Sequence, residues 1–155
     1  RSEKSVTPMF LLGVFLWEPV RRHADQLRSS KKMSVVQSLT LAAYEISGLQ
    51  QSRVSVPRRF TSAMREMLAM QPRFEVNRGK RALNFLEHRR FRAAYDFMML
   101  RARCGDFDEG LAEFWTSVQT QNIEERRKSF QMQQGQRSNK GRRLGRRRRR
   151  DDQKE

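Results

Sequence analysis

Cysteine, histidine and long apolar runs are all scarce in this 155-residue sequence. Its single cysteine, Cys104, cannot form an internal disulfide, and with only two histidines it cannot complete a four-ligand zinc site. The longest apolar run, residues 9–17, is far shorter than the ~20 residues of a membrane-spanning helix, and its flanks do not read as a signal peptide. These absences exclude a transmembrane protein and indicate a cytoplasmic one.

Negative charge is scarce as well. The sequence has 17 Asp and Glu against 33 Lys and Arg, which gives a net charge of +16. This excess is larger than solubility requires, so an anionic partner is expected: RNA, DNA or an anionic membrane surface. The chain begins at Arg1 rather than at a methionine, and we expect it to be a piece of a longer protein.

The positive charge is unevenly distributed and predicts two parts. Residues 133–155 contain ten basic and three acidic residues and one apolar residue, Leu144. Without apolar surface to bury, this tail cannot offset an ordering cost of ~1 to 2 kcal/mol per residue, so we expect it to be disordered. Residues 1–132 carry 23 basic and 14 acidic residues and form the predicted body.

The body is predicted to be an all-α bundle of about six helices, because no stretch alternates apolar and polar residues as a strand does. Pro8 after Thr7 begins a first helix that is apolar on all sides, hence buried, and that Pro19 kinks or ends. Ser34 and Gln37 have the spacing of a capping box. The further helices are expected over residues 35–50, from Pro57 to Pro72, after an Asn77 cap, over residues 91–98 and over residues 107–118.

One pattern resembles a metal site. Asp106 and Asp108 are two residues apart, and on a strand both carboxylates would share a face and hold magnesium. No strand pattern precedes them, however, and Asp106 followed by Glu109 fits the N-cap of the last helix. We favour the capping interpretation and expect no bound metal.

The other reactive residue types form no catalytic motif. His23 and His88 lie far apart and outside any zinc or triad pattern, so we interpret them as surface or helix-end residues. Cys104 is expected to be a buried structural thiol. Gly79-Lys80 lacks the remaining residues of a phosphate-binding loop. No catalytic residue is therefore assigned.

The basic residues are the strongest functional signal in the body. Helical spacing places many of them on two or three adjacent helices, where they can follow a phosphate backbone. A merely solvated polar face is the alternative. The candidates in the body are Arg58, Arg59, Arg65, Arg78, Lys80, Arg81, Arg89, Arg90, Arg92 and Arg101, and those in the tail are Arg142, Arg143, Arg146, Arg147, Arg148, Arg149 and Arg150.

Aromatic residues accompany these cations and are able to stack on bases. Their helical spacing is more typical of a core, to which we assign them. They are Phe91, Tyr95, Phe97, Phe114 and Trp115.

Several strings resemble one known family. Residues 79–102, GKRALNFLEHRRFRAAYDFMMLRA, are similar to the C-terminal region of bacterial poly(A) polymerases, relatives of the CCA-adding tRNA nucleotidyltransferases. Residues 56–61 resemble the family's proline-led basic helix start, and residues 10–19 resemble the apolar helix that opens this region. Residues 111–118 and 137–150 match, in order, an acidic helix with tryptophan and an arginine-rich C-terminus.

The resemblance implies an RNA-binding domain of an enzyme that adds adenylates to RNA 3′ ends. The family's catalytic head, which binds ATP and magnesium, has no counterpart in this sequence, so we expect this chain alone to be inactive and to bind neither. The implied partners are single-stranded RNA 3′ ends and RNA-decay proteins such as a helicase or an endonuclease. Two alternatives stay open. One is a stand-alone basic nucleic-acid-binding protein. The other is a protein-interaction module that exposes Met64, Met67, Met70, Met98 and Met99.

Overall fold

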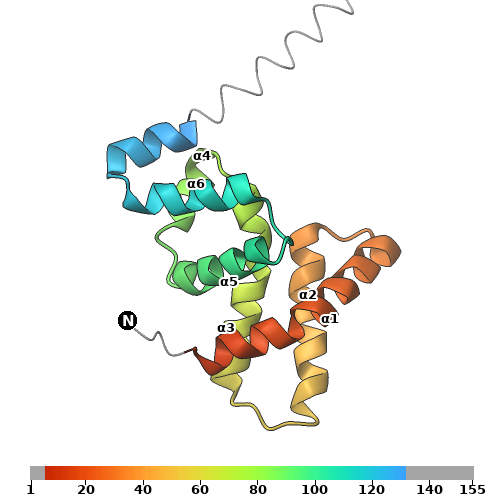
Figure 1. Cartoon of the computed structure of the whole chain (residues 1–155). Coiled ribbons are helices and arrows are strands. Elements are labelled where there is room, and N and C mark those ends of the chain that lie inside the picture. Colours follow the sequence, from red (N-terminus) through yellow and green to blue (C-terminus); the bar gives the residue numbers. More distant parts are fainter. Residues whose placement is uncertain (1–5, 132–155) are drawn as a thin grey trace, which may run out of the picture.

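The computed structural model describes residues 6–131, which contain helices and no strand (Figure 1). The all-α prediction is confirmed. The elements are α1 (Pro8–Lys31), α2 (Val35–Gln51), α3 (Arg58–Ala69), the 3₁₀ helix η1 (Gln71–Glu75), α4 (Gly79–Phe85), α5 (Phe91–Arg103) and α6 (Glu109–Thr120). Residues 123–131 are also helical. The predicted boundary near residue 132 and the predicted disordered tail, residues 133–155, lie outside the described residues.

Local capping signals begin the first three helices where the sequence predicts. The Thr7 hydroxyl accepts a hydrogen bond from the Phe10 amide at the start of α1. Ser34 and Gln37 form a capping box at α2, with both hydrogen bonds 3.2 Å long. Pro57 is the N-cap residue of α3. The Thr7 and Ser34 side chains satisfy backbone donors that a helix start leaves free, whereas Pro57 forms no side-chain cap and only has a backbone suited to a helix start.

Two parts of the α1 prediction are wrong, namely that Pro19 could end the helix and that the helix is buried on all sides. Pro19 lies inside α1 and does not end it, because Leu16, Val20 and Ala24 on both sides of it are buried in one continuous core. The helix is not buried on all sides either, since Leu11 and Phe15 are exposed, Phe15 by 76%. Packing of one stripe of α1 against the core therefore compensates for the backbone hydrogen bond that Pro19 cannot donate. The apolar residues on the opposite face of α1 stay exposed.

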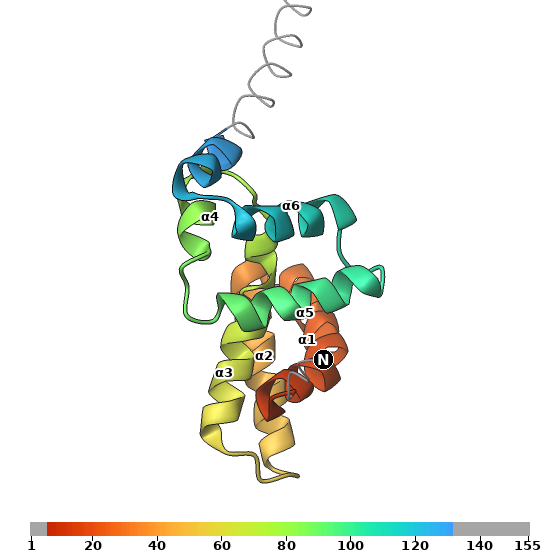
Figure 2. The ribbon, with the colours of Figure 1, turned by 60° about the vertical axis from the view of Figure 1, so that its left-hand side comes forward.

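The helices form two packed groups. α1, α2 and α3 pack against one another, and α5 crosses beside α1 and α3 (Figure 2). The second group surrounds Trp115, which is fully buried and whose ring lies 5.3 to 6.0 Å from the rings of Phe74, Phe85, Phe91 and Phe130. Trp115 Nε1 also donates a 2.8 Å hydrogen bond to the Phe74 carbonyl. This aromatic cluster joins η1, α4, α5, α6 and residues 123–131.

The cluster confirms the core interpretation of the predicted aromatics and rejects the methionine surface. Phe91, Tyr95, Phe97 and Trp115 are buried, and Phe114 is half-buried against the same core. Met64, Met67, Met70 and Met98 are buried as well, and Met99 is half-buried. An adaptable surface made of these methionines is therefore excluded.

Two features around α4 and α6 differ from the sequence prediction. Arg78, not Asn77, is the N-cap residue of α4, and no side chain caps that helix. Gly79 follows with φ +78°, a conformation that favours glycine. The helix over residues 123–131 was not predicted, although Asn122 and Glu125 form a reciprocal capping pair at its start, with hydrogen bonds of 3.1 and 2.9 Å.

Candidate nucleic-acid interface

The ten predicted basic residues of the body lie on three helices and their connections. Arg58, Arg59 and Arg65 belong to α3, and Arg92 and Arg101 belong to α5. Arg78 precedes α4, and Lys80 and Arg81 lie in its first turn. Arg89 and Arg90 lie in the turn before α5. Their local environments separate residues that stabilise the fold from residues that are free to contact a ligand.

Arg101 is a structural residue. Its side chain is 11% exposed, and its guanidinium donates to Asp106 Oδ2 at 2.9 Å, to the Asp106 carbonyl at 3.0 Å and to Gln71 Oε1 at 3.3 Å. It also lies over the Trp17 ring, 4.6 Å from the centroid. A guanidinium with all these partners has few donors left for RNA.

Four further arginines are engaged to different degrees. Arg65 donates to Ser47 Oγ at 2.6 Å and lies over the Tyr44 ring. Arg90 and Arg89 both donate to Glu66 Oε2, at 3.1 and 3.4 Å.

Arg92 pairs with Asp96 at 3.3 Å, one helical turn along α5. Arg89 and Arg92 keep most of their side chains exposed, so these surface pairs are weak and exchangeable.

The remaining cations form two separate groups. None of Arg58, Arg59, Lys80 and Arg81 forms an ion pair within residues 6–131, and all four are exposed. Arg58 and Arg59 begin α3, whereas α4 lies at its opposite end in Figures 1 and 2. The length of α3, about 18 Å, separates the two groups. The structure therefore does not bring the ten residues into one stripe.

Nearby cations that the sequence prediction left out enlarge both groups. Arg53 is exposed in the connection that leads to α3, so the α3 basic group is Arg53, Arg58 and Arg59. Residues 123–131 lie beside α4 in Figures 1 and 2, and Arg127 and Lys128 are exposed there. The α4 basic group consists of Arg78, Lys80, Arg81, Arg127 and Lys128. The three consecutive basic residues 126–128 were the sequence pattern that could have indicated the additional cations of the α4 basic group.

Two other missed arginines serve the fold. Arg126 donates to the carbonyls of Val118 and Gln119, both at 2.8 Å, and so satisfies the last turn of α6. Arg73 lies over the Phe85 ring, 4.2 Å from the centroid, and burial lowers its pKa from the ordinary value.

Asp106 does not cap α6, contrary to the prediction. Asp108 does so, because its Oδ1 accepts from the Leu111 amide at 2.8 Å. Burial alone raises the pKa of Asp106, but hydrogen bonds from Arg101 and Trp17 and the charges of Arg101 and Arg21 outweigh burial and lower it. Asp106 is therefore a charged structural carboxylate.

The other reactive residue types also have structural surroundings. Among residues 6–131, no group of three or more His, Cys, Asp or Glu residues is arranged to hold a metal ion. His23 contacts Glu45 of α2, and the His88 ring lies 3.9 Å from Glu66. Cys104 is exposed, so its prediction as a buried thiol is wrong. It follows the end of α5, where the chain turns through Gly105 and leaves the core.

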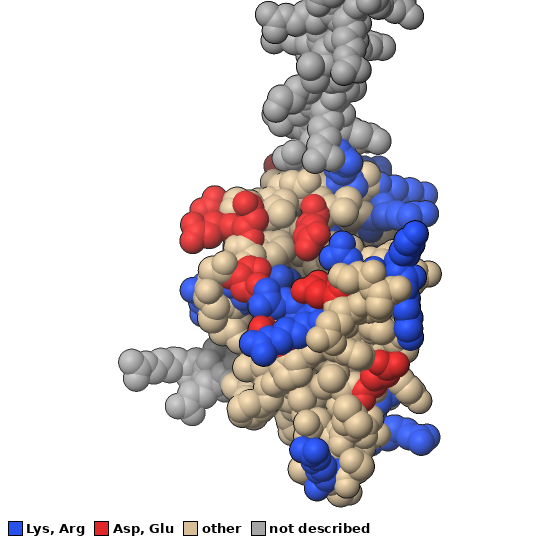
Figure 3. All heavy atoms as spheres, turned by 90° about the vertical axis from the view of Figure 1, so that its right-hand side faces the viewer, with Lys and Arg blue, Asp and Glu red and all other residues tan. Residues whose placement is uncertain are grey.

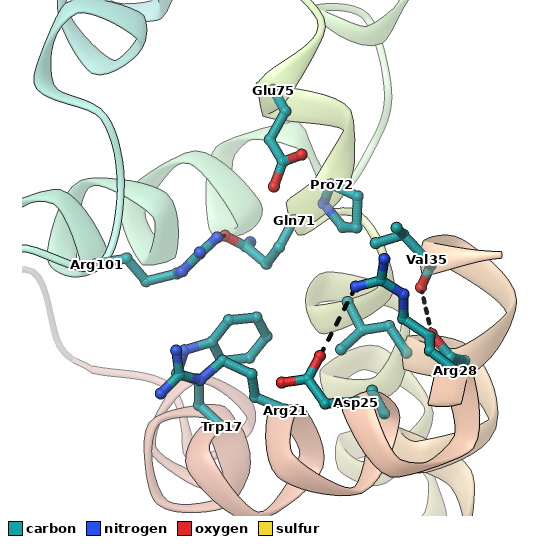
Figure 4. A pocket seen from close by; sticks show the side chains of 12 residues that line it. Trp17, Arg21, Asp25, Arg28, Val35, Gln71, Pro72, Glu75 and Arg101 are labelled. Atoms are coloured by element: carbon teal, nitrogen blue, oxygen red, sulfur yellow. Dashed lines mark hydrogen bonds and ion pairs between the residues drawn. The ribbon is translucent and has the colours of Figure 1, made fainter. Parts of the chain in front are cut away.

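A small cavity between α1, α2 and η1 contains both signs of charge (Figure 4). Its volume is about 120 Å³, and its charged lining is Arg21, Arg28, Arg101, Asp25 and Glu75. Arg28 lies 3.8 Å from Asp25, and Arg101 is already engaged by Asp106. Figure 3 shows the same mixture at the surface, with Lys and Arg side chains at the centre and along the upper right of this face. The cavity is not a dedicated phosphate site.

Comparisons with a family model and with individual known proteins agree on one family. Residues 31–154 match the model of the family described as polymerase A arginine-rich C-terminus. The chain is 30% identical over 121 residues to Poly(A) polymerase I of Salmonella typhi, covering 77% of this chain and 26% of that protein. It is 29% identical over 130 residues to Poly(A) polymerase I of Haemophilus influenzae, covering 83% of this chain and 29% of that protein.

The match reaches both basic groups and the arginine-rich residues 142–150. The chain spans only about a quarter of the length of the curated relatives it matches. No helix among the described residues is long and apolar enough to cross a membrane.

Proposed function

The chain belongs to the polymerase A arginine-rich C-terminus family, and from this premise we propose that it is an RNA-binding region of a polynucleotide adenylyltransferase. The observation that carries the proposal is the family match over residues 31–154, which contain most of the chain's Lys and Arg. The whole enzyme would add adenylates to RNA 3′ ends. ATP and magnesium would bind its catalytic part, and this chain would hold the RNA.

The proposed mechanism of binding is electrostatic. The α3 and α4 basic groups each present exposed cations, and each phosphate contact releases a counterion from the RNA. Two groups separated by about 18 Å suit an extended single strand, whose phosphates are several ångströms apart, better than a compact ligand. The arginine-rich residues 142–150 would raise the rate of capture without reading the base sequence.

Affinity across a salt series tests the proposal. The ligands are a single-stranded oligoadenylate and a duplex DNA of equal length, measured with the full chain and with a variant that lacks residues 133–155. We expect tighter binding to the single strand and a preference that survives removal of the tail. Equal binding to both ligands, or no binding once the tail is removed, would contradict a substrate-holding body.

Contact with RNA-decay proteins and a cytoplasmic location stay predictions. A pull-down from a bacterial lysate treated with nuclease tests the first, because a helicase or an endonuclease retained without RNA would contact the protein directly. The control is a chain with Lys80→Gln and Arg81→Gln, which weakens RNA-bridged contacts.

A further inference from the structure

A groove with a volume of about 470 Å³ lies between α5 and α6. Its apolar floor consists of Met99, Ala102 and Ala112, and its charged rim consists of Arg103, Glu109 and Glu113. Within residues 6–131, neither of the two rim carboxylates forms an ion pair. The groove therefore offers an apolar surface whose rim carries two carboxylates and one guanidinium, none of which forms an ion pair within residues 6–131.

The surroundings of this groove are acidic in a strongly basic protein. Residues 104–125 contain six Asp and Glu and no Lys or Arg, whereas the whole chain has a net charge of +16. Figure 3 shows Asp and Glu side chains gathered at the upper left of that face, apart from most of the Lys and Arg. This separation of charge favours a cationic occupant with a short apolar element.

We propose that residues 142–148 of this same chain occupy the groove and hold the arginine-rich segment away from RNA. Leu144 is the one apolar residue in 133–155, and arginines flank it at positions 142, 143 and 146–150. Leu144 covers the floor formed by Met99, Ala102 and Ala112. Arg143 and Arg146 lie against Glu109 and Glu113.

The length of chain permits this contact. Phe130 packs on Phe114 and Trp115 of α6, with ring centroids 5.2 and 5.7 Å apart, so the described chain ends beside the helix that forms one wall of the groove. Thirteen residues from Gln131 to Leu144 reach about 45 Å when extended. α6 itself is only about 18 Å long. A segment that continues from residue 131 therefore reaches the groove with chain to spare.

The contact competes with RNA, and this consequence rests on the proposed function. The same arginines cannot neutralise Glu109 and Glu113 and also bind phosphates. RNA has a far higher density of charge than two carboxylates, so it displaces the segment from the groove. Binding then becomes selective for ligands that engage the two basic groups of the body and the arginine-rich segment together.

The single cysteine provides a direct test that needs no RNA. Cys104 is exposed and follows Arg103 of the rim, so a nitroxide attached there reports on the groove. In a ¹⁵N-labelled chain at low salt, we expect the label to broaden the Leu144 amide signal strongly. High salt, or the double variant Glu109→Gln with Glu113→Gln, should restore the signal.

Matched controls keep the result specific. The variant Glu75→Gln with Glu87→Gln makes the same change in net charge away from the groove. In this variant the Leu144 amide signal should stay broadened. A nitroxide on Leu49→Cys, in a chain with Cys104→Ser, should leave the Leu144 signal sharp, because Leu49 is exposed near the C-terminal end of α2. Equal broadening by both labels, or none by either, would overturn the proposal. So would broadening seen only between a labelled and an unlabelled copy, because the occupant would then be a second molecule.

An oligoadenylate titration separates this inference from the proposed function. We expect the Glu109/Glu113 variant to bind oligoadenylate about two- to five-fold more tightly than the Glu75/Glu87 variant, since two exposed ion pairs no longer compete. If no variant binds oligoadenylate but the label still broadens Leu144, the proposed function fails and the contact stands. If RNA binds and the Leu144 signal stays sharp, the contact fails.

Discussion

The indole Nε1 of Trp17 donates a 3.0 Å hydrogen bond to Asp106 Oδ2 across 89 residues of chain. The same carboxylate accepts from Arg101 at 2.9 Å and pairs with Arg21 at 3.2 Å. Asp106 therefore joins α1 to the C-terminal end of α5. This junction fixes the position of α1 relative to α5.

Asp106→Asn should destabilise the protein by about 1 to 3 kcal/mol, because Arg101 keeps its burial but loses its carboxylate partner. Urea denaturation measures the change. Asp96→Asn is the matched control, since Asp96 forms only a surface pair with Arg92 and its loss should cost less than about 0.5 kcal/mol. Equal losses in the two variants would contradict a structural role specific to Asp106.

Acid should remove the stability that Asp106 contributes. Its pKa is lower in the folded state than the ordinary value of 3.8, so the contribution is complete well above pH 3.8. It is lost as the pH falls from 3.8 through the lowered folded pKa. The difference in unfolding free energy between the native chain and Asp106→Asn should therefore shrink below about pH 4. A difference that does not change with pH in this range would contradict the pKa argument.

Gly48→Ala should stabilise the protein by about 0.5 to 1 kcal/mol. Gly48 is exposed inside α2, and an added Cβ would meet no atom within 4 Å, so the gain in helix propensity is not opposed. Gly105→Ala is expected to have the opposite sign, because Gly105 has φ +77°. Thermal denaturation measures the change in stability of each variant. Stabilisation by Gly105→Ala would contradict the backbone argument.

Lys80→Gln with Arg81→Gln should weaken oligoadenylate binding and reduce the slope of log affinity against log salt by about 1.4, as two lost phosphate contacts on a single strand require. Helix content should not change, because both side chains are exposed and form no ion pair with described residues. Arg101→Gln is a poor control, since it removes a structural residue. Arg92→Gln, which removes one charge, is a suitable one, and a loss of slope half as large there would show that the cations act only through net charge.

Deletion of residues 133–155 should weaken RNA binding and flatten its salt dependence, because the segment carries ten of the 33 basic residues. Circular dichroism should show little loss of helix, since the described core closes around Trp115 and Phe130 without that segment. Unfolding on deletion would show that the body extends beyond residue 132.

Much of the fold was readable from local patterns. The capping box at Ser34, the proline before α3 and the stripe of Ala94, Tyr95 and Met98 each act within one or two helical turns, so the sequence alone carries the signal. The family resemblance also needed no structure, because it depends on the order of strings along the chain. The all-α class and the excess of positive charge follow from the same kind of local information.

Tertiary structure decided which cations are free. Ten basic residues looked equivalent along the chain, but Arg101 is enclosed by Trp17, Gln71 and Asp106, whereas Lys80 and Arg81 meet no carboxylate among residues 6–131. It also decided that α1 continues through Pro19 and leaves Phe15 exposed. The physical reason is that burial and ion pairing depend on residues far away in sequence, such as Trp17 and Asp106, whose proximity no local pattern encodes.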